Sequence, residues 1–198
     1  MKRKIGFLGG SFDPIHFGHL HLGISLQEAH GLDEVIVCPA FQSPLKHEHP
    51  NNDKHRLAMA ELAVQDLPTW RAVDWEIARK GPSYTIETIQ FCQKNVFTRD
   101  VQVYLLLGED LLPELNQWKD IEKLLELAPP LVGCRKRENL RGNPQIDAKL
   151  SSGVTITNIL EISATDIRQR LKKGLYCGHL VPAKVLDYIS LHRLYSSI

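Results

Sequence analysis

The sequence predicts an α/β protein with a Rossmann-like, doubly wound and mainly parallel sheet that carries helices on both faces. First, short apolar runs alternate with helical patterns along the chain. Second, the apolar run 101–107 is interrupted by a single polar residue, which fits a parallel strand covered on both faces. Third, a glycine-rich turn follows the first apolar run, where open α/β sheets bind their ligands.

Each expected element has a local signal. The expected strands are 5–8, 34–38, 72–77, 101–107, 131–134 and 154–162. The expected helices are 20–29, 53–65, 84–94, 111–127, 163–173 and 182–194. Their boundary signals are Gly31 and Gly174 at helix ends, the N-caps Asp53, Ser83 and Ser163, and Pro182 at a first helical position. No change of composition marks a linker, so we expect one domain, 1–198, with 163–198 as its C-terminal helical part.

The composition is that of an average soluble globular protein. The 198 residues are 43% hydrophobic and 24% charged, with a net charge of +1. Without a polybasic segment or a long apolar run, we expect neither a nucleic-acid nor a membrane partner. The four cysteines lie far apart and the first apolar run is too short for a signal peptide, so we expect reduced thiols and a cytoplasmic location. A homo-oligomer is compatible with these data.

The segment 9–19, GGSFDPIHFGH, offers the densest chemistry in the chain. Gly9 and Gly10 let backbone N–H groups approach a phosphate, and the following helix N-terminus favours anions. His16 and His19 lie about one helical turn apart and can face one ligand. A metal pair would need a third protein ligand, which the neighbouring sequence does not offer, and a purely structural role is the other alternative. We favour a phosphate cradle, in which each neutral imidazole donates an N–H and protonation would add charge.

This segment resembles the signature of the HxGH nucleotidyltransferase superfamily, and most closely that of the bacterial nicotinate-mononucleotide adenylyltransferases. The resemblance implies that His16 and His19 act in catalysis with Arg168. It also implies that Gly9, Gly10, Ser11 and Phe12 bind the phosphates of ATP.

Two further stretches resemble elements that bind the mononucleotide in this family. GPSYTIETI, 81–89, is similar to an SYTxxTL element and implies that Thr85 holds the nicotinate carboxylate, although a helix capped by Ser83 would explain it equally well. LGEDLL, followed by Trp118, resembles GxDxLxxLxxW and implies that Asp110 binds a ribose and that Trp118 stacks on the pyridine ring. A core tryptophan is the alternative. Glu109 departs from the pattern.

The fourth stretch, ISATDIR at 162–168, resembles ISSTxIR, with Ala164 in place of the second serine. The resemblance assigns Ser163, Thr165 and Arg168 to the triphosphate; a capping box would explain Ser163 but not Arg168. Lys46 and Arg135 resemble basic family positions near the nucleotide. The neighbouring histidines His47, His49 and His55 suggest a solvated loop rather than a metal site.

The resemblance implies transfer of the adenylyl group of ATP to nicotinate mononucleotide, giving deamido-NAD and pyrophosphate, with Mg²⁺ arriving on ATP. Its phosphate nucleophile is already ionised, so no general base is needed. Alternative acceptors are nicotinamide mononucleotide and phosphopantetheine, the latter disfavoured by the Tyr84–Thr85 and Trp118 elements. A nucleotide-binding regulator without turnover is a further alternative, which Glu109 and Ala164 would support and the intact His16 and His19 oppose.

Overall fold

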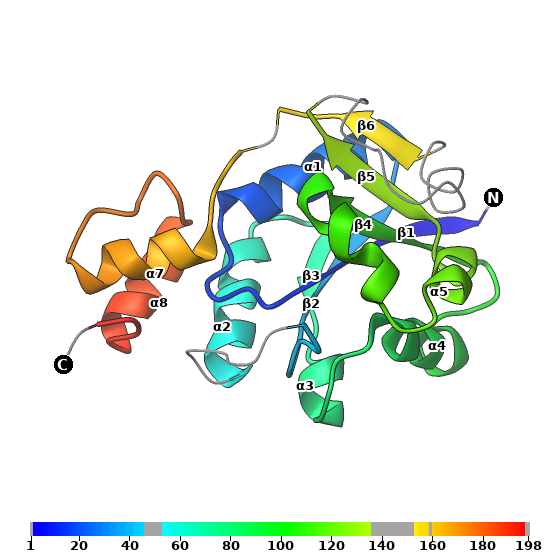
Figure 1. The fold of residues 1–198 in the computed structure, drawn as a ribbon, viewed down its shortest axis with the longest axis horizontal. Coiled ribbons are helices and arrows are strands. Elements are labelled where there is room, and N and C mark those ends of the chain that lie inside the picture. Colours follow the sequence, from blue (N-terminus) through cyan, green and yellow to red (C-terminus); the bar gives the residue numbers. More distant parts are fainter. Residues whose placement is uncertain (1, 46–52, 136–152, 159, 197–198) are drawn as a thin grey trace.

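The computed structural model describes residues 2–45, 53–135, 153–158 and 160–196. Six strands form one parallel sheet in the order β3-β2-β1-β4-β5-β6 (Figure 1). The strands are β1 (Arg3–Gly10), β2 (Glu34–Pro39), β3 (Trp70–Ala72), β4 (Val101–Gly108), β5 (Pro130–Cys134) and β6 (Val154–Ile156). The order reverses direction between β1 and β4, so the carboxyl ends of these two strands flank a topological switch point.

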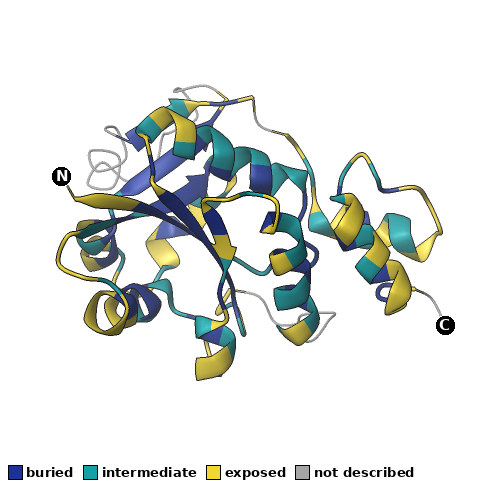
Figure 2. Ribbon diagram, turned by 180° about the vertical axis from the view of Figure 1, so that it is seen from behind, coloured by how far each residue is buried: buried dark blue, intermediate teal, exposed yellow. Residues whose placement is uncertain are grey.

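Helices cover both faces of this sheet, which confirms the predicted fold class. They are α1 (Phe17–His30), α2 (Asp53–Val64), α3 (Trp75–Arg79), α4 (Thr85–Asn95), the 3₁₀ segment η1 (Glu109–Gln117), α5 (Ile121–Leu127), α7 (Ala164–Lys172) and α8 (Ala183–Leu191). Alternate residues of β2 point to opposite layers: Val35 and Val37 belong to one apolar cluster, and Ile36 and Cys38 to the other. Figure 2 shows the strands as a buried layer between more exposed helices.

The two clusters divide the helices between the faces. The first cluster includes Leu20 of α1, Met59 of α2, Ile167 of α7 and Val185 of α8. The second includes Ile89 of α4 and residues of α5. In Figure 1, α7 and α8 lie to one side of the sheet, next to α2. The C-terminal helices therefore extend the layer that α1 and α2 form.

Several predicted boundaries are confirmed, and their signals act as expected. Gly31 ends α1 with a φ of 60°, the left-handed conformation that glycine adopts without strain. Ser163 caps α7, since its side chain accepts a hydrogen bond from Asp166 N at 3.4 Å. Pro182 was predicted at the first helical position of the last helix, but that helix begins at Ala183 and Pro182 is its N-cap.

Other predictions were wrong, and local geometry explains them. The strand expected at 72–77 ends at Ala72, because the chain turns after Val73 N bonds Val37 O and then forms α3. The helix expected at 111–127 is interrupted at Trp118, whose backbone is extended, and at Asp120, whose φ is 50°. The strand expected at 154–162 stops at Ile156. Ser83 does not cap α4, since Tyr84 occupies the N-cap.

Candidate active site

Two cavities lie along the carboxyl ends of the central strands, where the sequence predicted a ligand site. The polar cavity, of about 790 Å³, is lined among others by His16, His19, Asp110, Arg135, Thr165 and Arg168. The apolar cavity, of about 170 Å³, is lined among others by Gly9, Gly10, Tyr84, Thr85, Trp118 and Lys119. Ser11 lines both cavities. The predicted residues from four distant stretches of the chain therefore meet around one pair of cavities that share a residue.

His16 and His19 form a stacked pair at the start of α1. Their ring centroids lie 3.6 Å apart, and the planes are inclined by 25°. His16 N donates a hydrogen bond to His19 Nδ1 at 3.2 Å. Because Nδ1 accepts this bond, a neutral His19 carries its proton on Nε2 and can donate it to a ligand.

Because His16 is buried, its side chain is uncharged at neutral pH. His16 is 5% exposed, and desolvation lowers its pKa to about 4. This imidazole is therefore neutral near pH 7 and offers a dipole rather than a cation. The charge that protonation would add, as anticipated from the sequence, is not available from His16 at neutral pH.

Side chains from three other elements hold the loop between β1 and α1. Arg56 of α2 donates from Nη1 to Ser11 O at 2.8 Å, and Arg168 of α7 donates from Nη1 to Asp13 O at 2.8 Å. The Tyr195 hydroxyl donates to Asp13 Oδ1. Phe12, at a φ of 49°, lies edge-on to His19 with ring centroids 5.0 Å apart. These bonds fix the loop before any ligand arrives.

Arg56 and Tyr195 were missing from the residues predicted for the site. In the sequence, Arg56 is one of several charged residues of an expected helix, and Tyr195 lies near the end of the chain, so neither carried a functional signal. Arg56 is only 1% exposed. Burying a guanidinium group costs free energy unless hydrogen bonds satisfy it, and here backbone carbonyl oxygens accept those bonds. Arg168, which was predicted to bind phosphate, also donates to Thr165 Oγ1 at 3.2 Å and so divides its bonds between α7 and the loop.

Glu109 and Arg135 lie together at the rim of the polar cavity. Arg135 N donates to Glu109 Oε2 at 3.1 Å, and the guanidinium Nε lies 3.6 Å from Glu109 Oε1. The same guanidinium pairs with Glu161. The departure from the family pattern at Glu109 therefore places a carboxylate against the predicted nucleotide-binding arginine.

Asp110 lies in the polar cavity, although it was predicted to bind the mononucleotide. A Cβ at Gly108 would lie 2.3 Å from Asp110 Oδ1, so a larger residue where β4 ends would displace the Asp110 carboxylate. Ser163 and Thr165, at the start of α7, and Ala164 line the same cavity. Only Thr85 and Trp118 of the three predicted mononucleotide residues line the apolar cavity.

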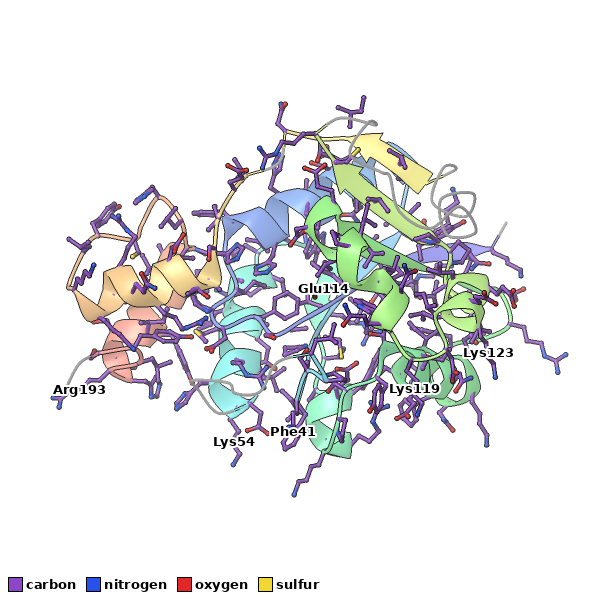
Figure 3. All side chains as sticks on the ribbon, viewed as in Figure 1. Phe41, Lys54, Glu114, Lys119, Lys123 and Arg193 are labelled. Carbon is purple, nitrogen blue, oxygen red and sulfur yellow. The ribbon has the colours of Figure 1, made fainter. Side chains whose placement is uncertain are left out.

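The apolar cavity has a cation that was not predicted. Lys119 Nζ lies 4.5 Å from the centroid of the Tyr84 ring and 2.7 Å from Glu87 Oε1. Thr85 begins α4, and the partly buried Trp118 packs against the second apolar cluster. Glu114 and Lys119, both labelled in Figure 3, follow the end of β4 and line this cavity. Lys119 directly follows Trp118, and this position was the only signal in the sequence that could have pointed to it.

Three predicted residues, Lys46, His47 and His49, lie outside the described residues. His55 is described: its Nδ1 lies 2.9 Å from the Tyr188 hydroxyl, and its ring centroid lies 5.3 Å from that of His192. Within the described ranges, no group of three or more histidine, cysteine, aspartate or glutamate side chains could hold a metal ion. In the same ranges, no helix is long and apolar enough to cross a membrane.

Known proteins resemble this chain over its whole length. Residues 7–170 match the family model described as cytidylyltransferase-like. A probable nicotinate-nucleotide adenylyltransferase of Roseiflexus sp. is 38% identical over 196 residues, which cover 96% of this chain and 97% of that protein. One of Herpetosiphon aurantiacus is 35% identical over 198 residues, covering 98% of each.

Solved structures show the same fold. The Plasmodium falciparum nicotinic acid mononucleotide adenylyltransferase complexed with NaAD has a TM-score of 0.71 and 22% identity, covering 98% of this chain and 97% of that one. The same enzyme complexed with APC has a TM-score of 0.70 and 21% identity, covering 98% and 97%. The full-length identity and the family model together show that the chain belongs to the cytidylyltransferase-like family and, within it, to the nicotinate-nucleotide adenylyltransferases.

Proposed function

We propose that the protein transfers the adenylyl group of ATP to nicotinate mononucleotide, giving deamido-NAD and pyrophosphate. The observation that carries this proposal is the pair of cavities that share Ser11. A nucleoside triphosphate suits the larger, polar cavity, and a pyridine ring suits the smaller, apolar one. The two reacting phosphates then meet at Ser11, above the end of β1.

In this reaction a 5′-phosphate oxygen of the mononucleotide attacks the α-phosphorus of ATP, and the bond from that phosphorus to the pyrophosphate oxygen breaks. The nucleophile is already ionised, so the protein need not remove a proton. Its task is to place two anions in line and to stabilise charge on the transferred and leaving groups. The Nε2–H of His19, the neutral imidazole of His16 and the cation of Arg168 suit that task.

Most of the remaining roles follow the cavities. We assign Ser11, Phe12, Arg135, Ser163 and Thr165, which line the polar cavity, to ATP, and Thr85, Asp110 and Trp118 to the mononucleotide. Gly9 and Gly10 line the apolar cavity, so their assignment to the phosphates of ATP follows the resemblance. Lys46 is proposed for phosphate binding from the resemblance alone. Asp110, at the polar side, would meet a ribose between the cavities. Arg135 would exchange Glu109 or Glu161 for phosphate oxygens. We also propose that 1–198 acts as one domain, since α7 supplies Arg168 to a loop that follows β1.

Magnesium fits this site as an ion that arrives with ATP. Asp110 and Glu161 supply carboxylate oxygens at the polar cavity, the donor type that Mg²⁺ prefers, without a complete protein cage. When bound, the ion would neutralise charge on the phosphates. The four cysteines are buried and form no disulfide bond, which supports the proposed cytoplasmic location.

The choice of nicotinate rather than nicotinamide rests on charge. The nicotinate ring carries a carboxylate that nicotinamide lacks. Lys119 and the N-terminus of α4 at Thr85 both border the apolar cavity and favour an anion there. Nicotinamide mononucleotide is the second candidate, because the stacking surface of Trp118 serves either ring.

A pyrophosphate-release assay tests the proposal. The purified protein is incubated with ATP, Mg²⁺ and each mononucleotide in turn. We expect release with both, with kcat/KM at least tenfold higher for nicotinate mononucleotide, which corresponds to about 1.4 kcal/mol. If neither mononucleotide supports pyrophosphate release, the proposed function is overturned. Equal kcat/KM values for the two mononucleotides would overturn the assignment of the acceptor.

A further inference from the structure

A buried carboxyl group borders the apolar cavity outside the predicted site. Glu76 belongs to α3, lines the cavity and is only 4% exposed. The sequence predicted a strand here, so this side chain had no expected role. A buried carboxyl group is costly unless hydrogen bonds satisfy it, and its partners show what it holds.

Two hydroxyl groups lie against the Glu76 carboxyl group. Thr88 Oγ1 donates to Glu76 Oε1 at 2.7 Å, and the Ser83 hydroxyl is close enough to lower the pKa of the same carboxyl group. Burial raises the pKa of Glu76, and the two hydroxyl bonds oppose that rise. The carboxyl group thus depends on α4 and on the residue just before its N-cap.

Ser83 also contacts the segment that follows β2. Its Oγ accepts hydrogen bonds from Phe41 N at 2.9 Å and from Gln42 N at 3.4 Å. Because both N–H groups point at oxygen lone pairs, the single hydroxyl proton is left for Glu76. Ser83 N in turn donates to Gln42 O at 2.8 Å. Glu76 therefore orients the hydroxyl that holds two consecutive peptide groups.

The anchored segment faces both parts of the site. Ser43, Pro44 and Leu45 follow it and line the apolar cavity together with Tyr84 and Thr85. On its other side, Phe41 O accepts from Arg56 Nη2 at 3.0 Å, and Arg56 also holds Ser11 O. The peptide group that joins Phe41, labelled in Figure 3, to Gln42 is thus bonded from both sides. Bonds run continuously from Glu76 to the residue that both cavities share.

We propose that Glu76 is a positioning residue for the mononucleotide: through the Ser83 hydroxyl it holds 41–42, and with it the 43–45 wall, at the spacing that the pyridine nucleotide requires. This rests on the proposed function. The competing explanation is that the cluster only stabilises the fold. Thr88 separates the two, because it bonds the same carboxyl group but has no bond to 41–42 in the described structure.

The test compares Ser83→Ala with the matched control Thr88→Val. Each removes one buried hydroxyl bond to Glu76, but only the first releases the Phe41 and Gln42 N–H groups. We expect Ser83→Ala to raise KM for nicotinate mononucleotide about five- to tenfold, the usual range for loss of a buried hydrogen bond, with kcat and KM for ATP within about twofold. Thr88→Val should lower the melting temperature similarly and leave that KM within about twofold.

Glu76→Gln provides a second variant. It keeps the shape of the side chain but turns an amide toward one of the hydroxyls. We expect the same selective rise in KM, and we expect the double variant with Ser83→Ala to be no worse than either single variant, because the residues act in series. An unchanged KM in Ser83→Ala, or an equal rise in Thr88→Val, would overturn the proposal.

The wild-type protein is assayed first, so that failure of the proposed function is seen separately. If neither mononucleotide supports pyrophosphate release, the proposed function fails. Calorimetric titration of the same three variants with nicotinate mononucleotide then tests the positioning role on its own. A dissociation constant that rises in Ser83→Ala but not in Thr88→Val supports it, and equal constants overturn it.

Discussion

The polar and the apolar cavity are built in different ways from the same sheet edge. The polar cavity takes most of its residues from two short stretches, 11–19 and 160–168. The apolar cavity takes one or a few residues from each of many elements, such as Ala40, Glu76 and Lys119. The residues proposed to bind phosphate therefore lie close together in the sequence, whereas the shape of the cavity proposed for the acceptor depends on packing between distant segments.

The largest expected effect comes from a substitution in the polar cavity. We expect His19→Ala to lower kcat for pyrophosphate release about 10²- to 10³-fold, because it removes the Nε2–H donor from the transferred phosphoryl group. His30→Ala is the control: it removes a histidine from the far end of α1, where Nε2 bonds Thr155 Oγ1 at 2.7 Å, and should change kcat less than twofold. A loss below about tenfold in His19→Ala would exclude a catalytic role.

The polar cavity should also carry a pH dependence of stability. Below pH 6.5 an unfolded His16 binds a proton that the folded residue, with a pKa of about 4, does not. Folding stability should therefore fall as the pH drops from about 6.5 toward 4, by on the order of 3 kcal/mol. Urea denaturation at pH 7.5 and 4.5 measures it, and His16→Asn should flatten the difference. Parallel pH curves for the two proteins would contradict the buried, neutral imidazole.

At the apolar cavity, Trp118→Ala should act on the acceptor alone. Stacking on an aromatic ring contributes about 1–3 kcal/mol per base, so we expect KM for nicotinate mononucleotide to rise tenfold or more. The KM for ATP should stay within about threefold, because Trp118 does not line the polar cavity. Equal increases in both constants would mean that Trp118 serves the core rather than the ligand.

The smallest expected effect concerns the choice of ring. Lys119→Met keeps much of the side-chain length but removes the charge beside Tyr84. Because Lys119 is half-exposed, we expect only about a fivefold fall in the preference for nicotinate over nicotinamide mononucleotide, measured as the ratio of the two kcat/KM values. Lys123→Met, on the exposed side of α5, is the control and should leave the ratio unchanged.

The same contrast explains what the sequence could predict. The motif Gly9–His19 consists of residues that are adjacent in the sequence. His16, His19 and their place at a strand–helix junction could therefore be predicted without a structure. Ser163 was found because a capping residue acts locally. Glu76 was missed because the alternation of apolar and charged residues in 73–77 is typical of a strand, and five residues are too few to distinguish it from one helical turn.

Other misses depend on tertiary contacts. The helical period runs on through 111–127, and only the extended backbone of Trp118 and the left-handed Asp120 divide it into η1 and α5. This break brings Lys119 over Tyr84, a residue 35 positions earlier in the chain (119 minus 84). The pairing of Glu109 with Arg135 likewise joins the ends of two neighbouring strands, which sequence spacing does not reveal.

The bond between Tyr195 and Asp13 spans 182 positions of the chain. A nascent chain on the ribosome carries the complete histidine motif early, yet synthesis must reach residue 195 before this bond can hold the loop. Removal of Tyr195 would loosen the loop beside His16 without cutting any residue near it in the sequence.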